Sequence, residues 1–207
     1  MLTVKICGLT DAGDALMAAE AGADYLGFVF APSSPRTLSV ADCLWVEAVP
    51  FPAKVGVFRD QPRDFIEQVR EKAGLSWVQL HGQEPPELCE ALGGRQAVIK
   101  VITVETSVDW ELVKTYAQVS RILFDAGGGS GRSFPWELLA SPPLALRFWI
   151  AGGLSPDNVA QAIAVCAPAG VDVSSGVESC PGRKDPVKVR AFIRAVREGG
   201  LREAVTG

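Results

Sequence analysis

The sequence lacks several features that would assign it to a specialised class of protein. No apolar run approaches the about 18 residues that span a bilayer, and Met1–Lys5 is not a charged segment followed by an apolar core. Basic blocks are also missing, and Lys+Arg 20 against Asp+Glu 24 gives a net charge of −4, which argues against a nucleic-acid partner. We therefore expect a cytoplasmic protein that binds neither a membrane nor a nucleic acid.

Cysteine and histidine are sparse. The chain has one histidine and five cysteines without any C-x-x-C pair, namely Cys7, Cys43, Cys89, Cys166 and Cys180. An odd, dispersed set of cysteines disfavours both a disulfide framework and a zinc site. We expect four of them to be small buried side chains.

What the sequence does contain is a regular alternation of short apolar runs and amphipathic stretches over its 207 residues. The runs predict strands at Thr3–Cys7, Asp24–Phe30, Lys54–Phe58, Ser76–Leu80, Ala97–Ile102, Arg121–Asp125, Arg147–Ala151 and Val171–Ser174. Between and after them, helices are predicted at Asp11–Glu20, Val40–Ala48, Arg63–Lys72, Pro86–Leu92, Val108–Thr115, Pro135–Leu139, Pro156–Val165 and Pro186–Glu198.

Alternating strands and helices indicate an α/β fold with a parallel sheet. Eight units without a linker predict a closed (β/α)₈ (TIM) barrel, a single domain over residues 1–207. An open doubly wound sheet is the alternative, but it usually has fewer strands. The short helices predicted after the third to sixth strands explain how so few residues close a barrel.

The active site of such a barrel lies at the carboxyl ends of its strands. Alternation of side chains along a strand directs polar residues from four strands toward the barrel axis at this end. These residues are Lys5 and Cys7, Gln79 and His81, Asp125, and Asp172 and Ser174.

Three candidate residues come from the first and last strands, which become neighbours when the barrel closes. Lys5 and Asp172 can neutralise each other inside the barrel as a structural pair, or Lys5 can favour the thiolate of Cys7. Cys7 precedes Gly8, which allows the chain to turn sharply and leaves the Cys7 thiol facing the mouth of the barrel. The alternative is that Cys7 is simply a buried small side chain.

Asp125 opens a glycine-rich segment, Asp125–Gly131. A carboxyl group at a strand end suits acid–base catalysis when a mobile loop, here the glycine-rich segment, closes over the site and excludes water. The alternative is that this segment is a plain flexible loop. His81 either transfers protons in catalysis or is a neutral side chain that lines the site and forms hydrogen bonds.

Glycine turns follow the seventh and eighth strands, with Gly152 and Gly153 in one and Ser175 and Gly176 in the other. Bare backbone amides in these two loops frequently hold a phosphate in barrels of this kind. Arg36, after the second strand, is suited to a second anionic group, although it can also be an ordinary surface arginine.

Six motifs in order resemble phosphoribosylanthranilate isomerase of tryptophan biosynthesis. They are Lys5-Ile-Cys-Gly8, Ser34-Pro-Arg36, Gln79-Leu-His-Gly82, Asp125 with Ser130-Gly131, Ala151-Gly-Gly-Leu154 and Gly170-Val-Asp-Val-Ser-Ser-Gly-Val-Glu178. The resemblance covers residues 4 to about 193. Two positions differ from the common family pattern, with Ser130 in place of threonine and Pro135 in place of aspartate.

The resemblance implies an Amadori rearrangement of N-(5′-phosphoribosyl)anthranilate to 1-(o-carboxyphenylamino)-1-deoxyribulose 5-phosphate. It implies Cys7 as general base and Asp125 as general acid, and no metal or organic cofactor. The implied substrate contacts are Arg36 to the anthranilate carboxylate, Asp172 to the sugar, and Gly152, Gly153, Ser175 and Gly176 to the phosphate. The expected partner is this small phosphoribosyl molecule, and the expected assembly is a monomer or homodimer.

Other functions remain open at this point. One is a different phosphosugar isomerase or epimerase barrel, such as the histidine-pathway isomerase, which would use two aspartates where this chain has Cys7 and Asp125. Another is a catalytically silent barrel that only binds a phosphorylated ligand.

Overall fold

Eight parallel strands close into a barrel in the order in which they occur in the chain, and β8 pairs with β1. The computed structural model describes residues 2–127 and 133–206. The barrel strands are β1 (Thr3–Ile6), β2 (Tyr25–Val29), β3 (Lys54–Phe58), β4 (Trp77–Leu80), β5 (Val98–Thr103), β6 (Arg121–Asp125), β7 (Phe148–Ile150) and β8 (Gly170–Val173). The closed (β/α)₈ barrel is therefore confirmed, and the open sheet is excluded.

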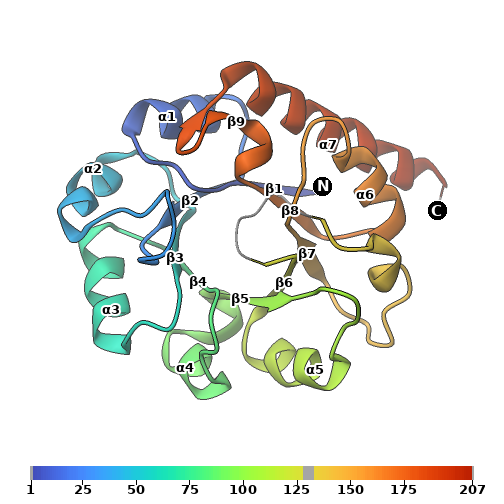
Figure 1. Cartoon of the computed structure of the whole chain (residues 1–207), viewed down its shortest axis with the longest axis horizontal. Helices are drawn as coiled ribbons and strands as arrows, with labels where there is room; N and C mark the ends of the chain where they lie inside the picture. The colour runs from blue at the N-terminus through green and yellow to red at the C-terminus, as the bar shows by residue number, and fades with distance from the viewer. Residues whose placement is uncertain (1, 128–132, 207) are drawn as a thin grey trace.

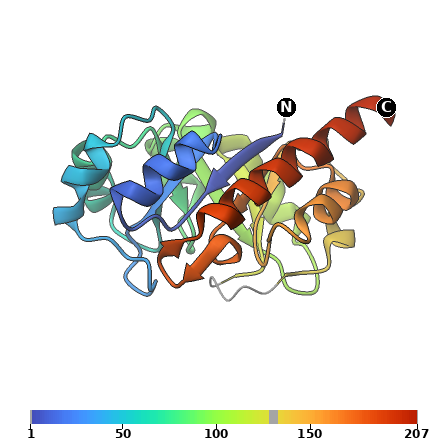
Figure 2. The same cartoon turned by 90° about the horizontal axis from the view of Figure 1, so that it is seen from above.

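Helices surround the barrel on its outside (Figure 1). They are α1 (Ala12–Glu20), α2 (Cys43–Ala48), α3 (Arg63–Lys72), α4 (Pro86–Ala91), α5 (Trp110–Val119), α6 (Val159–Cys166) and α7 (Pro186–Thr206). Short 3₁₀ helices occur as η1 (Val40–Asp42), η2 (Gly94–Gln96), η3 (Trp136–Leu139) and η4 (Ser175–Val177). A small antiparallel hairpin, β9 (Glu178–Cys180) with β10 (Arg183–Lys184), lies at one end of the barrel beside the start of α7 (Figure 2).

Several predicted helices differ from the observed elements. The helix predicted at Val40–Ala48 is divided into η1 and α2, the one predicted at Val108–Thr115 is shifted to Trp110–Val119, and the one predicted at Pro186–Glu198 extends to Thr206. The segment predicted as a helix at 135–139 is the 3₁₀ helix η3, because Pro142 and Pro143 follow it closely and proline cannot continue a helix. The helix predicted from Pro156 begins at Val159, because Asn158 closes a turn in which its Oδ1 accepts the Ser155 N–H at 2.8 Å. The hairpin β9–β10 was not predicted.

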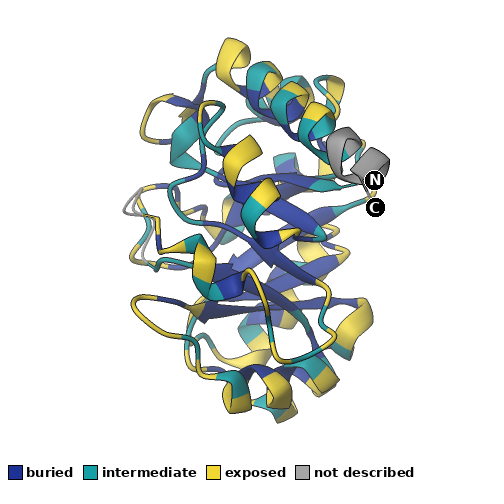
Figure 3. Ribbon diagram, turned by 90° about the vertical axis from the view of Figure 1, so that its right-hand side faces the viewer, coloured by how far each residue is buried: buried dark blue, intermediate teal, exposed yellow. Residues whose placement is uncertain are grey.

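The predicted alternation of side chains along β1 is confirmed. Val4 and Ile6 are buried in the core cluster that the strands form with the surrounding helices, while Lys5 is buried next to β8. A separate cluster fills the barrel interior and consists of Val55, Trp77, Ile99, Val101, Leu123, Trp149 and Ala151. Figure 3 shows the buried strands at the centre and the exposed residues on the outer faces of the helices.

Lys5 and Asp172 are register partners across the β1–β8 contact that closes the barrel. Lys5 Nζ lies 2.9 Å from Asp172 Oδ2, and both side chains are buried. The structural pairing of these residues is therefore present. No helix of the described residues is both long and apolar enough to cross a membrane.

Candidate active site

A cavity of about 290 Å³ lies at the carboxyl ends of the strands. Residues that follow β1, β2, β3, β4, β6, β7 and β8 line it. Its polar lining consists of Cys7, Ser33, Ser34, Arg36, Arg59, Gln79, His81, Asp125, Asp172, Ser174 and Ser175, together with the glycines Gly127, Gly152 and Gly153. The polar cluster that the sequence predicted at one mouth of the barrel is therefore present.

Cys7 lies directly after β1, where its N–H donates to the Val173 carbonyl at 2.8 Å. Gly8 then turns the chain with φ of +74°, a conformation that favours glycine. Cys7 is 7% exposed, lines the cavity and packs with Val29 and Val57. Both sequence hypotheses for Cys7 thus hold in part, because the side chain is largely buried and also borders the cavity.

Burial raises the pKa of the Cys7 thiol above its usual range, whereas the Lys5 ammonium opposes that shift and Asp172 adds to it. The expectation that Lys5 favours the thiolate is correct in direction. Its effect on the pKa of the thiol is smaller than that of burial.

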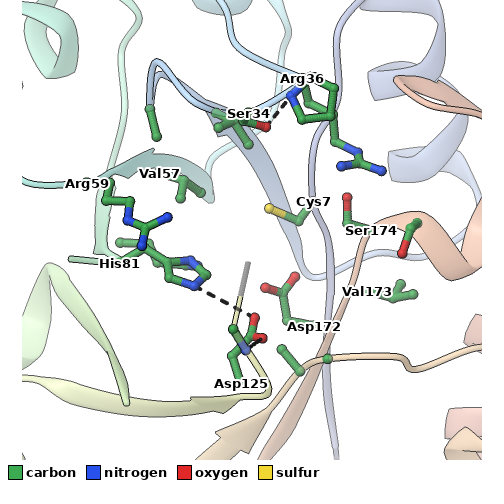
Figure 4. Close-up of a pocket in the computed structure, with 18 of the residues that line it drawn as sticks. Cys7, Ser34, Arg36, Val57, Arg59, His81, Asp125, Asp172, Val173 and Ser174 are labelled. Carbon is green, nitrogen blue, oxygen red and sulfur yellow. Dashed lines mark hydrogen bonds and ion pairs between the residues drawn. The ribbon is translucent and has the colours of Figure 1, made fainter. Parts of the chain in front are cut away.

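Asp125 ends β6 and accepts the Gly127 N–H on Oδ1 at 2.7 Å. Its Oδ2 lies 4.0 Å from His81 Nε2, the pair joined by a dashed line in Figure 4. Burial lowers the pKa of His81, against the opposing effects of Asp125 and Asp172. A neutral imidazole that hydrogen-bonds to a ligand therefore suits His81 at neutral pH.

Arg36 lines the cavity, yet it is not an ordinary surface arginine. Its side chain is buried, and Nε and Nη2 donate to the two carboxylate oxygens of Glu178 at 2.7 and 2.6 Å. A second cation, Lys184, contacts Glu178 Oε1 at 2.8 Å.

The loops after β7 and β8 lie in direct contact. A side chain at Gly176 would collide with the backbone carbonyl of Leu154, which confirms that the two loops are neighbours. Gly152 and Gly153 have φ of +85° and +64°. Gly152, Gly153 and Ser175 line the cavity, whereas Gly176 is not among its lining residues.

The backbone N–H groups of these loops are available as donors. Across residues 2–127 and 133–206, no hydrogen bond is donated by the backbone N–H of Gly152, Gly153, Ser175 or Gly176. Unpaired N–H groups beside a cavity suit an anion.

Buried polar side-chain atoms without a hydrogen-bond partner concentrate at this cavity. In the described part of the chain they include Gln79 Oε1, His81 Nε2, Asp172 Oδ1 and Ser174 Oγ, which all belong to lining residues. Buried polar groups are normally hydrogen-bonded. The cavity is therefore suited to a ligand with several hydroxyl or oxyanion groups.

Sequence reasoning assigned no role to Arg59, Glu178 and Lys184. Arg59 follows Val57 with the inward alternation of β3, and Figure 4 shows it beside His81. Strand alternation therefore contained a signal for Arg59. Glu178 and Lys184 belong to the unpredicted hairpin, and nothing local in the sequence connects them with Arg36.

The glycine-rich segment after Asp125 is described only as far as Gly127, so Ser130 and Gly131 lie outside the described residues. Among the described residues, no group of three or more His, Cys, Asp or Glu side chains is placed to hold a metal ion. Figure 4 shows Cys7 and Asp125 entering the site from different elements with Asp172 between them. A thiol and a carboxyl group so arranged can move two protons on one bound molecule.

Comparison with known proteins agrees with this geometry. The family model described as N-(5′-phosphoribosyl)anthranilate (PRA) isomerase matches residues 4–195. The N-(5′-phosphoribosyl)anthranilate isomerase of Pelobacter propionicus is 44% identical over 205 residues, which cover 96% of this chain and 97% of the relative.

Two solved structures are also similar. The crystal structure of phosphoribosyl anthranilate isomerase from Thermotoga maritima superposes with a TM-score of 0.88 at 41% identity, covering 96% of this chain and 100% of that one. A phosphoribosyl anthranilate isomerase in complex with reduced 1-(o-carboxyphenylamino)-1-deoxyribulose 5-phosphate superposes with a TM-score of 0.86 at 40% identity, covering 96% and 100%. With nearly the whole chain matched in sequence and in fold, this protein belongs to the N-(5′-phosphoribosyl)anthranilate isomerase family.

Proposed function

We propose that this chain isomerises N-(5′-phosphoribosyl)anthranilate to 1-(o-carboxyphenylamino)-1-deoxyribulose 5-phosphate in tryptophan biosynthesis, with Cys7 as general base and Asp125 as general acid. Family membership supports the reaction. The observation that carries the residue assignment is that Cys7, directly after β1, and Asp125, at the end of β6, line one cavity.

The reaction needs one proton donor and one proton acceptor. Protonated Asp125 gives its proton to the ring oxygen, the bond between this oxygen and C1′ breaks, and an iminium ion forms. The Cys7 thiolate then removes the C2′ proton, which produces an enol. The enol hydroxyl loses its proton to water and C1′ gains one from water, so the product has the same composition as the substrate. Cys7 then gives its proton to solvent and Asp125 takes one up, which returns both groups to their starting states.

Three other residues hold the substrate between this acid and base. Arg36 binds the anthranilate carboxylate with the N–H groups that Glu178 leaves unused. Asp172 and His81 bind the sugar hydroxyls, which would satisfy Asp172 Oδ1 and His81 Nε2. Anchors at both ends of a substrate fix its reacting atoms and contribute to the rate.

The phosphate binds in the loops after β7 and β8. Gly152, Gly153 and Ser175 direct free N–H groups to the cavity, and the positive φ of the two glycines brings their backbone close to a ligand. Gly176 contributes by allowing the two loops to touch, since any side chain there would separate them.

The proposed setting is the cytoplasm, with a small phosphoribosyl molecule as the only partner of a monomer or homodimer. All five cysteines are free, as expected in a reducing compartment. The other functions considered, a different phosphosugar isomerase or a silent binding barrel, are not favoured, because the matched relatives have the name of this isomerase.

A turnover assay tests the proposal. Purified protein is mixed with freshly prepared N-(5′-phosphoribosyl)anthranilate, and the loss of anthranilate-type fluorescence is followed against a protein-free control. We expect saturable turnover that an excess of the product inhibits. Binding of the substrate without turnover would instead identify a silent phospho-ligand barrel.

A further inference from the structure

The carboxylate of Glu178 holds one edge of the Arg36 guanidinium. Nε donates to Oε1 at 2.7 Å and Nη2 donates to Oε2 at 2.6 Å, in a contact that joins residues 142 positions apart. Both side chains are less than 10% exposed. Two parallel hydrogen bonds between planar groups fix the plane of the guanidinium as well as its position.

This contact uses two of the five N–H groups of arginine. The edge formed by Nη1 and the second N–H of Nη2 stays available, and among the described residues no hydrogen bond from Nη1 is found. That edge can bind a second carboxylate with two further parallel hydrogen bonds. Because Arg36 lines the cavity and Glu178 does not, the second carboxylate would belong to a ligand.

Lys184 keeps this cluster positively charged. A Glu178 carboxylate alone would neutralise Arg36, but Lys184 Nζ lies 2.8 Å from Glu178 Oε1, and with Lys184 protonated the three groups carry a net charge of +1. Burial lowers the pKa of Lys184, and its contact with Glu178 opposes that shift. The pKa of Glu178 is lowered overall. Burial alone would raise it, but the hydrogen bonds from Arg36 and Lys184 have the larger combined effect. Glu178 therefore remains an anion at neutral pH.

The hairpin β9–β10 fixes both partners in place. Glu178 and Lys184 face each other across its two strands. The Lys184 N–H donates to Asp14 Oδ2 at 2.7 Å, and the Lys188 ammonium donates to the Glu178 carbonyl at 2.8 Å. The hairpin is thus tied to α1 and to α7, which are rigid elements of the barrel wall.

We propose that Glu178, supported by Lys184 on the hairpin β9–β10, is a positioning residue that presents the free edge of Arg36 to the aromatic carboxylate of the substrate. The proposal rests on the proposed function, since it deepens the role of Arg36 in that reaction. Glu178 acts through Arg36 and does not touch the ligand.

The positioning role of Glu178 is measured by the carboxylate preference, that is, by how much more tightly the protein binds a ligand that has the carboxyl group than one that lacks it. Equilibrium dissociation constants are determined by calorimetry for reduced 1-(o-carboxyphenylamino)-1-deoxyribulose 5-phosphate and for the same compound without its carboxyl group. The ratio is the dissociation constant of the compound without the carboxyl group divided by that of the compound with it, so it reports only the contribution of carboxylate recognition to binding. We expect Glu178→Gln to reduce this ratio by at least about tenfold, as loss of a charged, bidentate contact does.

A double-mutant cycle shows whether Glu178 acts through Arg36. In an Arg36→Met background, Glu178→Gln should change the ratio by less than about threefold, because the group that Glu178 positions is missing. In the single variant, KM for the substrate should rise more than kcat falls, since binding of the carboxylate is the same before and during the reaction.

Glu84→Gln is the matched control. Glu84 is also a buried glutamate, and its Oε2 lies 2.7 Å from Lys100 Nζ, but it does not contact Arg36 or line the cavity. This variant should lose stability and keep the carboxylate preference. Glu178→Asp retains the charge and shortens the side chain, so it provides a folded variant if Glu178→Gln unfolds, and it should also reduce the ratio.

An unchanged ratio in Glu178→Gln and Glu178→Asp, or an equal loss of affinity for both ligands, would overturn the proposal. These results would leave the proposed function intact if the wild-type protein turns over the substrate and Arg36→Met reduces the ratio. A wild-type protein without turnover would overturn the proposed function instead.

Discussion

At the scale of single residues, burial controls the chemistry of the proposed base. The Cys7 thiol has its pKa raised mainly by burial, and the cation of Lys5 only partly compensates. A base must lose its proton before it accepts one from the substrate. The fraction of Cys7 in the thiolate form is therefore expected to rise only at pH values above those at which an ordinary cysteine ionises.

This leads to a prediction on pH dependence. The rate of Cys7 alkylation by iodoacetamide should rise with pH, with a midpoint above the about 8.5 of an ordinary cysteine, because only the thiolate is alkylated. The measurement is made in a Cys180→Ser background, because Cys180 is the one exposed cysteine. A saturating product analogue should slow the alkylation, and a midpoint below that of ordinary cysteine would contradict the conclusion that burial dominates the ionisation of Cys7.

A second prediction concerns the acid. Asp125→Asn keeps an oxygen that can accept the Gly127 N–H, now 2.7 Å from Asp125 Oδ1, but removes the proton that opens the ring. Turnover should fall by at least about a hundredfold, while the dissociation constant of the product analogue changes little. Activity within about tenfold of the wild type, some 1.4 kcal/mol of barrier, would be too small an effect for the sole acid.

At the scale of elements, the glycine loops after β7 and β8 function as one unit because their backbones touch. Gly176→Ala would place a methyl group against the Leu154 carbonyl and force the loops apart. KM should rise and the affinity for inorganic phosphate should fall, both by about tenfold or more if one charged contact is lost.

Gly74→Ala is a suitable control for that variant. Gly74 has φ of +59° and lies between α3 and β4, and a side chain there would meet Lys54 Nζ at an ordinary 3.5 Å. The strained backbone should cost about 1–3 kcal/mol of stability without a change in KM. If both glycine variants leave phosphate affinity unchanged, the loops do not bind the phosphate.

A comparison of the predicted and observed elements shows which features follow from the sequence and which do not. All eight strands were predicted within one residue of their observed bounds, because the alternation of side chains and the apolar runs are local signals. The inward positions of Cys7, His81 and Asp172 follow from the same alternation. The contact of Arg36 with Glu178 was not predictable, since it joins the loop after β2 to strand β9 of an unpredicted hairpin, far away in the chain.

At the scale of the whole molecule, closure of the barrel places an ion pair in its interior. Lys5 is fully buried, and its partner Asp172 lies on the last strand. Removal of one member of such a pair leaves the other as an unpaired buried charge, which is costly.

Lys5→Met should therefore lower the free energy of unfolding by about 3–5 kcal/mol, measured by urea denaturation at neutral pH. In an Asp172→Asn background the same substitution should cost clearly less, because no buried carboxylate is left unpaired. Equal costs in the two backgrounds, or a cost below about 1 kcal/mol in the first, would show that the pair does not stabilise the closed barrel.

The central claim is that Cys7 removes the C2′ proton within this barrel, and kcat of Cys7→Ser tests it most directly. Serine preserves the size of the side chain but does not ionise at neutral pH, so it cannot accept the proton. In the fluorescence assay, kcat should fall by at least about a hundredfold, while the product analogue still binds and the variant remains folded. Turnover within about tenfold of the wild type would contradict the assignment of Cys7 as the base.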